Sequence, residues 1–132
     1  MNEEKKELFA NYIKSNIAPI LVDFINGSDI PNSIIVPATC NIEDLTGHYL
    51  GTEYVPPKWL NQLLKSNKQS ILIIDKIDSI PKNEQIKFVE ILKYRKVSTF
   101  EIPKDTIIIV TAKEINNKTI SETIYSLVSH IW

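Results

Sequence analysis

The sequence predicts an α/β fold, a small three-layer domain in which a short parallel sheet of about three strands is flanked by helices. Two runs, residues 71–74 and 107–110, are apolar on both strand faces, as expected of parallel strands covered by helices on each side. Segments with helical periodicity precede, separate and follow these runs. Because parallel neighbours need crossover connections, this alternation favours right-handed crossovers and a doubly wound sheet.

The N-terminal segment, residues 1–26, is predicted to form a helix. Its apolar side chains recur at three- and four-residue steps up to Phe24, which is the period of an amphipathic helix. Pro19 is expected to bend or divide this helix, and the sequence Asn26-Gly27-Ser28 is expected to end it.

The rest of the chain alternates strand and helix signals. Pro57 marks the start of a helix with Trp59 on its apolar face, and Pro81 marks the start of another. The expected elements are a strand at 34–36, a loop at 39–52, a helix after Pro57, a strand at 70–75, a helix after Pro81, a hairpin or extended excursion at 97–102, a strand at 106–111 and a helix at 119–130.

Composition limits the classes of function. The chain has 132 residues, enough for one compact domain, and its 15 Lys and Arg against 16 Asp and Glu give no general attraction to nucleic acid or anionic membranes. The longest apolar runs are too short to cross a bilayer and no hydrophobic signal core is seen, so a cytoplasmic protein without membrane contact is expected. Cys40 is the only cysteine and has no companion for a disulfide or a zinc site, and no metal site is predicted.

Asp75 and Thr111 stand at the carboxyl ends of the two apolar runs, where ligands bind in parallel sheets. An acid directly after four apolar residues is the Walker B arrangement, in which a strand delivers a carboxylate to Mg²⁺ beside nucleotide phosphates. Asp78 is a second acid in the same turn. Acids that cap the next helix or lie in solvent give the same string, and that interpretation has the greater weight here.

Further motifs surround this acid in an unbroken order. They are the stretch from Asn41 to Leu60 with its Asp-Leu-Thr-Gly and Gly-Thr-Glu-Tyr sequences, the turn Asp75-Lys76-Ile77-Asp78-Ser79-Ile80-Pro81, and the helix at 84–97 followed by the strand at 107–111. Together they resemble MoxR-like AAA+ ATPases, which have the P-loop NTPase fold. The resemblance implies that residues 1–132 form a single AAA+-like domain, partial and degenerate, in which residues 34–132 correspond to the AAA+ core.

The sequence departs from that family where ATP chemistry is carried out. No Gly-x-x-x-x-Gly-Lys-Ser/Thr loop is present to wrap backbone N–H groups around phosphates. Lys76 stands where the family has the glutamate that polarises water, and Ala112 or Lys113 stands where it has the first-sensor asparagine. The stretch Ser126-Leu127-Val128 lacks the finger arginine. Because phosphoryl transfer depends on positioned charges, we expect no ATPase activity from the chain alone.

The leading interpretation is therefore a catalytically inactive AAA+-like protein-interaction or regulatory module, a pseudo-ATPase with no expected cofactor. Its partner would be a protein, either an intact AAA+ ATPase or a second copy of the chain. One alternative is an incomplete ATPase subunit that completes a composite nucleotide site with a partner, and another is a clamp-loader-like subunit in DNA replication. A weak contact with ATP and Mg²⁺ would involve Asp75, Asp78 and Thr111.

Four residues are candidates for protein contact. Tyr49 and Tyr54 belong to the segment that, by the resemblance, lies near the subunit interface and pore of a ring, although such aromatics more often pin a loop to its own domain. Lys58 and Arg95 belong to two clusters of basic residues near helix ends, which solvated helix faces explain equally well.

Overall fold

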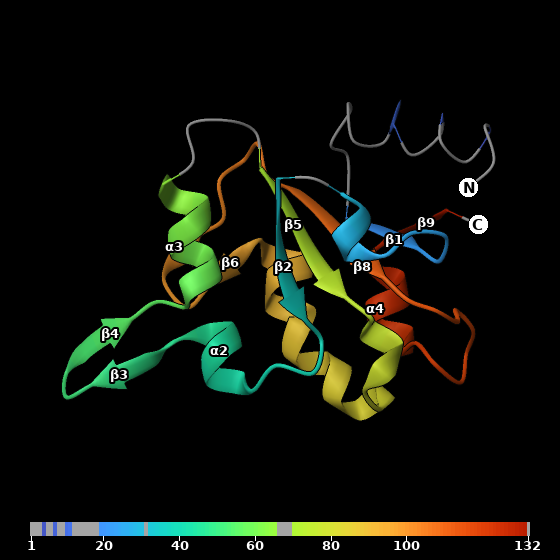
Figure 1. The fold of residues 1–132 in the computed structure, drawn as a ribbon. Coiled ribbons are helices and arrows are strands. Elements are labelled where there is room, and N and C mark those ends of the chain that lie inside the picture. Colours follow the sequence, from blue (N-terminus) through green and yellow to red (C-terminus); the bar gives the residue numbers. More distant parts are fainter. Residues whose placement is uncertain are drawn as a thin grey trace.

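A five-stranded sheet forms the centre of the molecule (Figure 1). The computed structural model describes residues 19–30, 32–65 and 70–131, with the isolated positions 4, 7, 10 and 11. All neighbouring strands are parallel, in the order β2-β5-β8-β1-β9. The strands are β1 (Ile20–Val22), β2 (Ser33–Pro37), β5 (Ile71–Asp75), β8 (Ile107–Thr111) and β9 (Ser129–Ile131). The predicted α/β class is confirmed, but the sheet has five strands rather than about three.

The two apolar runs form the middle of the sheet, as predicted. β5 and β8 pair in register from Ile71 opposite Ile107 to Ile74 opposite Val110. Every residue of β8 is buried, since strands lie on both of its edges and side chains cover both of its faces. The predicted strand at 34–36 is also confirmed, as β2, which pairs with β5 and with no other strand in the described part of the chain.

The prediction of one helix through residues 1–26 is wrong in its second half. Ile20, Leu21 and Val22 form strand β1 between β8 and β9, and none of the three side chains is exposed. A run of three apolar residues fits either a helix face or a buried strand, and Pro19 immediately before it favours a change of structure. The part of this prediction before Pro19 falls largely outside the described residues.

The predicted final helix at 119–130 is also wrong in length. Helix α4 covers only Glu122–Ser126, where the Ser121 side chain accepts a hydrogen bond from the Ile124 N–H at the start. The chain then extends into β9, and the Ser129 N–H donates to the Pro19 carbonyl next to β1 over 2.8 Å. The pairing of β9 with β1 supplies backbone hydrogen bonds that a continued helix would have made internally.

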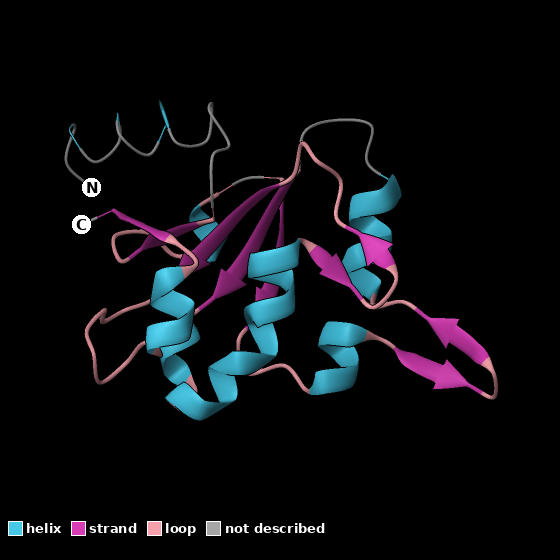
Figure 2. Cartoon of the chain, turned by 180° about the vertical axis from the view of Figure 1, so that it is seen from behind, coloured by secondary structure: helices cyan, strands magenta, loops and turns pink. Residues whose placement is uncertain are grey.

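Most of the helical segments gather on one face of the sheet, which lies behind the strands in Figure 1 and in front of them in Figure 2. Side chains from these helices join Leu72, Ile74, Ile108 and Val110 in the larger core cluster. The opposite face has a smaller cluster around Ile73 and Ile109, against which Phe24, Ile25 and Ile30 pack. The helical segments are α2 (Ile42–Thr46), α3 (Lys58–Lys65), the 3₁₀ helices η1 (Gly27–Asp29), η2 (Ile77–Ser79) and η3 (Lys82–Phe88), the π-helix η4 (Glu90–Tyr94), and α4.

The helices predicted after Pro57 and Pro81 are confirmed as α3 and as η3 with η4. The segment predicted as a loop, residues 39–52, contains more structure than expected. Asn41 caps α2 by accepting the Asp44 N–H, and the hairpin of β3 (His48–Leu50) and β4 (Glu53–Val55) follows and projects from the body of the molecule (Figure 1). Of the two forms expected at 97–102, a hairpin or an extended excursion, the structure has the hairpin, made of β6 (Lys96–Val97) and β7 (Phe100–Glu101).

Candidate functional site

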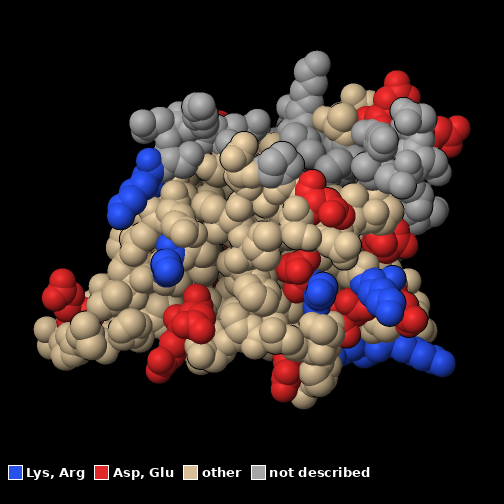
Figure 3. Space-filling model, viewed as in Figure 1, with Lys and Arg blue, Asp and Glu red and all other residues tan. Residues whose placement is uncertain are grey.

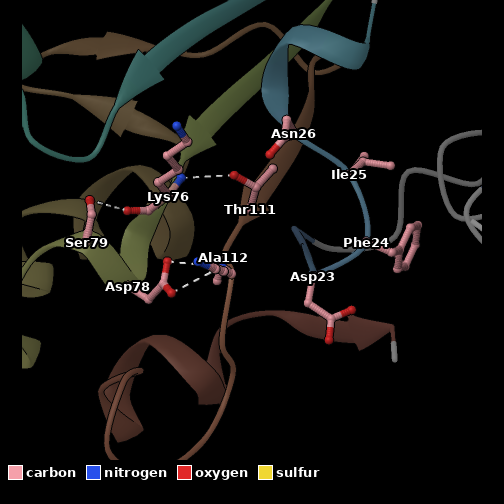
Figure 4. A pocket seen from close by; sticks show the side chains of 10 residues that line it. Asp23, Phe24, Ile25, Asn26, Lys76, Asp78, Ser79, Thr111 and Ala112 are labelled. Carbon is pink, nitrogen blue, oxygen red and sulfur yellow. Dashed lines mark hydrogen bonds between the residues drawn. The ribbon is translucent and has the colours of Figure 1, made fainter.

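β5 and β1 are the two neighbours of β8 in the sheet, and all three strands are parallel. Their carboxyl ends therefore lie side by side. A cavity of about 590 Å³ opens there, and Figure 4 shows residues from all three strand ends around it. Its lining comprises Asp23, Phe24, Ile25, Asn26, Lys76, Asp78, Ser79, Thr111, Ala112 and Lys113. This is the location that the sequence predicts for a ligand site.

Asp75, the predicted Walker B acid, is held by hydrogen bonds within the protein. The Thr111 hydroxyl donates to Asp75 Oδ1 over 2.7 Å, and the Gly27 N–H donates to the same oxygen over 3.1 Å. The Lys76 N–H in turn donates to the Thr111 hydroxyl oxygen over 2.9 Å. The predicted meeting of Asp75 with Thr111 is therefore observed, and the pair also fastens the loop that follows β1.

The loop after β1 follows a parallel strand and leads into the short 3₁₀ helix η1, and a phosphate-binding loop likewise connects a strand to a helix. Two amides of the loop after β1 are used internally: the Asn26 N–H donates to Asp29 Oδ2 over 2.9 Å, and the Gly27 N–H donates to Asp75. Gly27 is buried, and a Cβ added to it would lie 2.9 Å from Asp75 Oδ1 and 3.2 Å from Ile73 Cγ2. Only glycine lets this loop approach β5 so closely.

Asp78 holds the loop that follows β8. Its carboxylate accepts the Lys113 N–H over 3.1 Å and the Glu114 N–H over 2.9 Å, and Figure 4 shows it facing Ala112 beside the cavity. Asp78 thus joins the turns at the ends of two neighbouring strands. The two acids bind different loops: Asp75 binds the loop after β1, and Asp78 binds the loop after β8.

The charges around the cavity are balanced. Asp23 and Asp78 carry negative charge, while Lys76 and Lys113 carry positive charge. Lys76 is exposed and adopts a left-handed backbone conformation with φ of 59°, which turns the chain sharply after β5. Sites for nucleotide phosphates concentrate positive charge, whereas the charges that line this cavity are of both signs.

Gly27 and Asn26 are site residues that the sequence analysis missed. The sequence Asn26-Gly27 indicated the end of a helix, whereas in the structure these residues follow a buried strand. One signal was present: three apolar residues followed by Asp23 repeat, in shorter form, the apolar run followed by Asp75.

The four predicted contact residues lie in different surroundings. Tyr49 is 66% exposed on the projecting hairpin, and Lys58 is exposed at the start of α3. Tyr54 is half-buried, stacks on Phe100 with ring centroids 5.7 Å apart, and donates its hydroxyl hydrogen to the Thr46 carbonyl. Burial is the main cause of a raised pKa of Tyr54, and the nearby Tyr49 and Glu90 raise this pKa to smaller extents. It therefore anchors the hairpin to the body of the domain.

Arg95 is likewise engaged internally. Its guanidinium donates to the carbonyls of Pro103 over 3.2 Å and of Thr106 over 2.7 Å, which fixes the segment leading into β8. Burial lowers the pKa of Arg95. These bonds give Arg95 a structural role whether or not a partner also contacts it.

Two further findings concern metals and membranes. Among the described residues, no group of three or more His, Cys, Asp or Glu side chains is arranged to hold a metal ion. No helix in the same part of the chain is long and apolar enough to span a membrane.

Comparisons with known proteins add no assignment. No protein-family model matches the sequence, and no curated protein matches it. The motifs and the site geometry are therefore the basis for a functional proposal.

Proposed function

We propose that this chain is a catalytically silent AAA+-like module that acts through protein contacts. The family resemblance supplies the framework, and two features of the site support it. Asp75 and Thr111 come together at the ends of neighbouring strands β5 and β8, as expected of a Walker B acid and a first-sensor group. The loop after β1 lies against the same acid.

The internal use of the loop amides is the observation that carries the proposal. A phosphate-binding loop works because its backbone N–H groups are free to surround phosphate oxygens. Here Asp29 and Asp75 accept the amides of Asn26 and Gly27, so the protein supplies its own anions at this position. To bind phosphate, ATP would have to displace these carboxylates and would meet their charge.

Lys76 supports the same conclusion about hydrolysis. It stands where the family has the glutamate that polarises the attacking water, and a lysine cation cannot accept that proton. The Lys76 N–H donates to the Thr111 hydroxyl, which itself donates to Asp75. This hydroxyl therefore already has two partners within the protein.

Exposed apolar side chains support a role in protein contact. Five of the large ones fall within residues 35–64: Ile35, Ile42, Tyr49, Leu50 and Leu64. Figure 3 shows charged side chains scattered over this side of the molecule, including some over α3 and the projecting hairpin, with uncharged surface between them. Large apolar side chains left exposed in the same part of a chain are available for contact with another protein.

Titration with a fluorescent ATP analogue in the presence of Mg²⁺, combined with a phosphate-release assay, tests the proposal. We expect no saturable binding at micromolar nucleotide and no turnover, either for the wild type or for Lys76→Glu, which restores the acidic residue alone. Micromolar affinity or hydrolysis by the purified chain would contradict the proposal. Hydrolysis that appears only with an intact AAA+ ATPase, and is lost in Asp75→Asn, would instead favour the composite site.

A further inference from the structure

Asn26 and Gly27 form a chemically reactive pair in the loop after β1. They are the only Asn-Gly sequence in the chain. The backbone nitrogen that follows an asparagine can attack the side-chain amide carbon and close a five-membered ring. Glycine allows this attack most readily, because it has no Cβ to hinder the approach and leaves the backbone free to turn. In an unfolded chain, this pair is therefore where loss of a side-chain amide is expected first.

The reaction needs only water. The Gly27 nitrogen forms a bond to Cγ of Asn26, while the bond from Cγ to the side-chain nitrogen breaks and ammonia leaves with the proton that Gly27 gives up. Water then opens the cyclic imide at either of its two carbonyl carbons. One product has aspartate at this position, and the other has isoaspartate, in which the backbone runs through the side chain. No electrons are transferred, and the new carboxyl group ionises, so the chain gains one negative charge.

The folded loop holds the two reacting atoms apart. Ring closure requires rotation about the Cα–C bond of Asn26 until the Gly27 nitrogen eclipses Cβ, and the observed ψ of 154° is far from that position. The Gly27 N–H donates to Asp75 Oδ1 over 3.1 Å, so this rotation would break a hydrogen bond. The Asn26 N–H also donates to Asp29 Oδ2 over 2.9 Å, and the Asp29 N–H donates to the Asn26 carbonyl over 3.0 Å. The reaction therefore requires the loop to open.

Close packing opposes the same rotation. Gly27 is buried, and the position of an added Cβ is only 2.9 Å from Asp75 Oδ1 and 3.2 Å from Ile73 Cγ2. The Gly27 backbone thus has little room to turn while it lies against β5. Asn26 itself is exposed and lines the cavity beside the ends of β1, β5 and β8 (Figure 4). Water reaches this residue, so the conformation of the loop sets the rate.

We infer that Asn26 is a deamidation site whose reaction is controlled by the hydrogen bond between Gly27 and Asp75. The side-chain amide is preserved while the loop is closed and is lost when the loop opens, by local opening or by unfolding. Deamidation is then a covalent record of that opening. This modification goes beyond the proposed role in protein contact and does not depend on it.

The isoaspartate product cannot restore the closed loop. It adds one methylene to the backbone directly before Gly27, which displaces the N–H that Asp75 accepts. The new carboxylate also lies beside Asp29, whose own carboxylate binds the N–H of the modified residue. It adds to the negative charges of Asp23 and Asp78 at the cavity, and like charges at short range repel. The modification therefore keeps the loop open once it has occurred.

Peptide mapping by mass spectrometry during incubation in mildly alkaline buffer tests the control by the fold. Alkaline buffer promotes the reaction, because the attacking nitrogen must lose its proton. We expect Asn26 to deamidate several-fold more slowly in the folded wild type than in urea. Asp75→Ala, shown to be folded by circular dichroism, should react several-fold faster than the folded wild type, because the Gly27 N–H loses its acceptor. The matched control, Asp78→Ala, releases the loop after β8 instead and should react like the wild type.

Hydrogen exchange of the wild type provides a second test that needs no variant. If one opening controls both reactions, the protection factor of the Gly27 N–H should match the factor by which folding slows deamidation of Asn26. Equal deamidation rates in the folded and the urea-unfolded wild type would overturn the inference. A Gly27 amide that exchanges freely while deamidation stays slow would also overturn it, as would equal rates in folded Asp75→Ala and Asp78→Ala.

The product is tested separately. Ion-exchange chromatography isolates the deamidated protein, because it carries one more negative charge. Its isoaspartate form should unfold at a lower urea concentration than the wild type and should lack protection of the Gly27 N–H. Asn26→Ser has no side-chain amide and should yield no such fraction. An isoaspartate form that keeps both the stability and the protection of the wild type would refute the lasting opening of the loop.

Discussion

The Thr111 hydroxyl lies 2.7 Å from Asp75 Oδ1, where it joins the ends of the neighbouring strands β8 and β5. It also accepts the Lys76 N–H over 2.9 Å, and the same carboxylate oxygen receives the Gly27 N–H from the loop after β1. One hydroxyl and one carboxylate therefore connect three segments. In an active nucleotide site these groups would be available to a ligand, whereas here they stabilise the protein itself.

Replacement of Thr111 by valine should destabilise the protein. Thr111 is 2% exposed, and valine has nearly the same shape but leaves the Lys76 N–H without this acceptor and Asp75 Oδ1 with the Gly27 N–H in place of two donors. The expected loss is about 1–3 kcal/mol in the free energy of unfolding, measured by urea denaturation. Thr111→Ser retains the hydroxyl and should lose less. If Thr111→Val were as stable as the wild type, the hydrogen bonds at this position would have no net structural value.

Gly27→Ala should also destabilise, for a steric reason. The new methyl group would lie 2.9 Å from Asp75 Oδ1 and 3.2 Å from Ile73 Cγ2, so the loop after β1 would have to move away from β5. We expect a loss of about 1–3 kcal/mol by urea denaturation, as for other overpacked buried sites. Ser28→Ala, at the exposed neighbouring residue, is the control and should change stability by less than about 0.5 kcal/mol. Equal effects of the two changes would contradict the close approach of Gly27.

Long apolar runs made the centre of the fold predictable. Residues 71–74 and 107–110 became β5 and β8 because an apolar run between polar segments is stable only when both of its faces are covered. Asp75 and Thr111 could be placed for the same reason, since residues at the ends of adjacent parallel strands must be near each other.

The short strands were not predictable in this way. Ile20–Val22 and Ser129–Ile131 each have three residues, too few to establish a period of two, and their identity depends on pairing with each other and with β8. Gly27 was missed because the close approach that requires glycine exists only once β1 is placed beside β8. Whether the chain is an AAA+ relative stays a proposal.

The reactivity of Cys40 should be low in the folded protein. Burial raises the pKa of its thiol; Lys87 lowers this pKa and Asp44 raises it to smaller extents. Because the thiolate is the reactive form, reaction with Ellman's reagent at pH 8 should be several-fold slower than in urea. A folded-state rate equal to the unfolded rate would contradict this expectation.

The same shift in the pKa of Cys40 has a consequence for stability. A pKa that is higher in the folded state than in the unfolded state favours the folded form while the thiol is protonated. This contribution is fully present below the unfolded-state pKa and is lost as the pH rises through the folded-state pKa. The wild type should therefore lose more stability in the alkaline range than Cys40→Ser, as measured by urea denaturation at several pH values.

Gln85 should be the polar side chain whose loss is most costly. It is fully buried, and its Nε2 lies 2.7 Å from the Thr119 carbonyl oxygen and 3.2 Å from that of Ile77, while its Oε1 accepts the Ser121 N–H over 2.8 Å. The side chain thus joins η3 to the turn after β5 and to the start of α4. Gln85→Leu would remove these hydrogen bonds, and the Ser121 N–H and the Thr119 carbonyl would lose the partner that Gln85 provides.

We expect Gln85→Leu to reduce the free energy of unfolding by roughly 2–4 kcal/mol, because each orphaned buried group contributes its own desolvation cost. Gln62→Leu makes the same chemical change at an exposed position of α3 and should have little effect on unfolding. Hydrogen exchange provides a second measurement, since the Ser121 N–H should lose protection in Gln85→Leu and keep it in Gln62→Leu. Unchanged protection of that amide would show that Gln85 does not hold the start of α4, even if the overall stability fell.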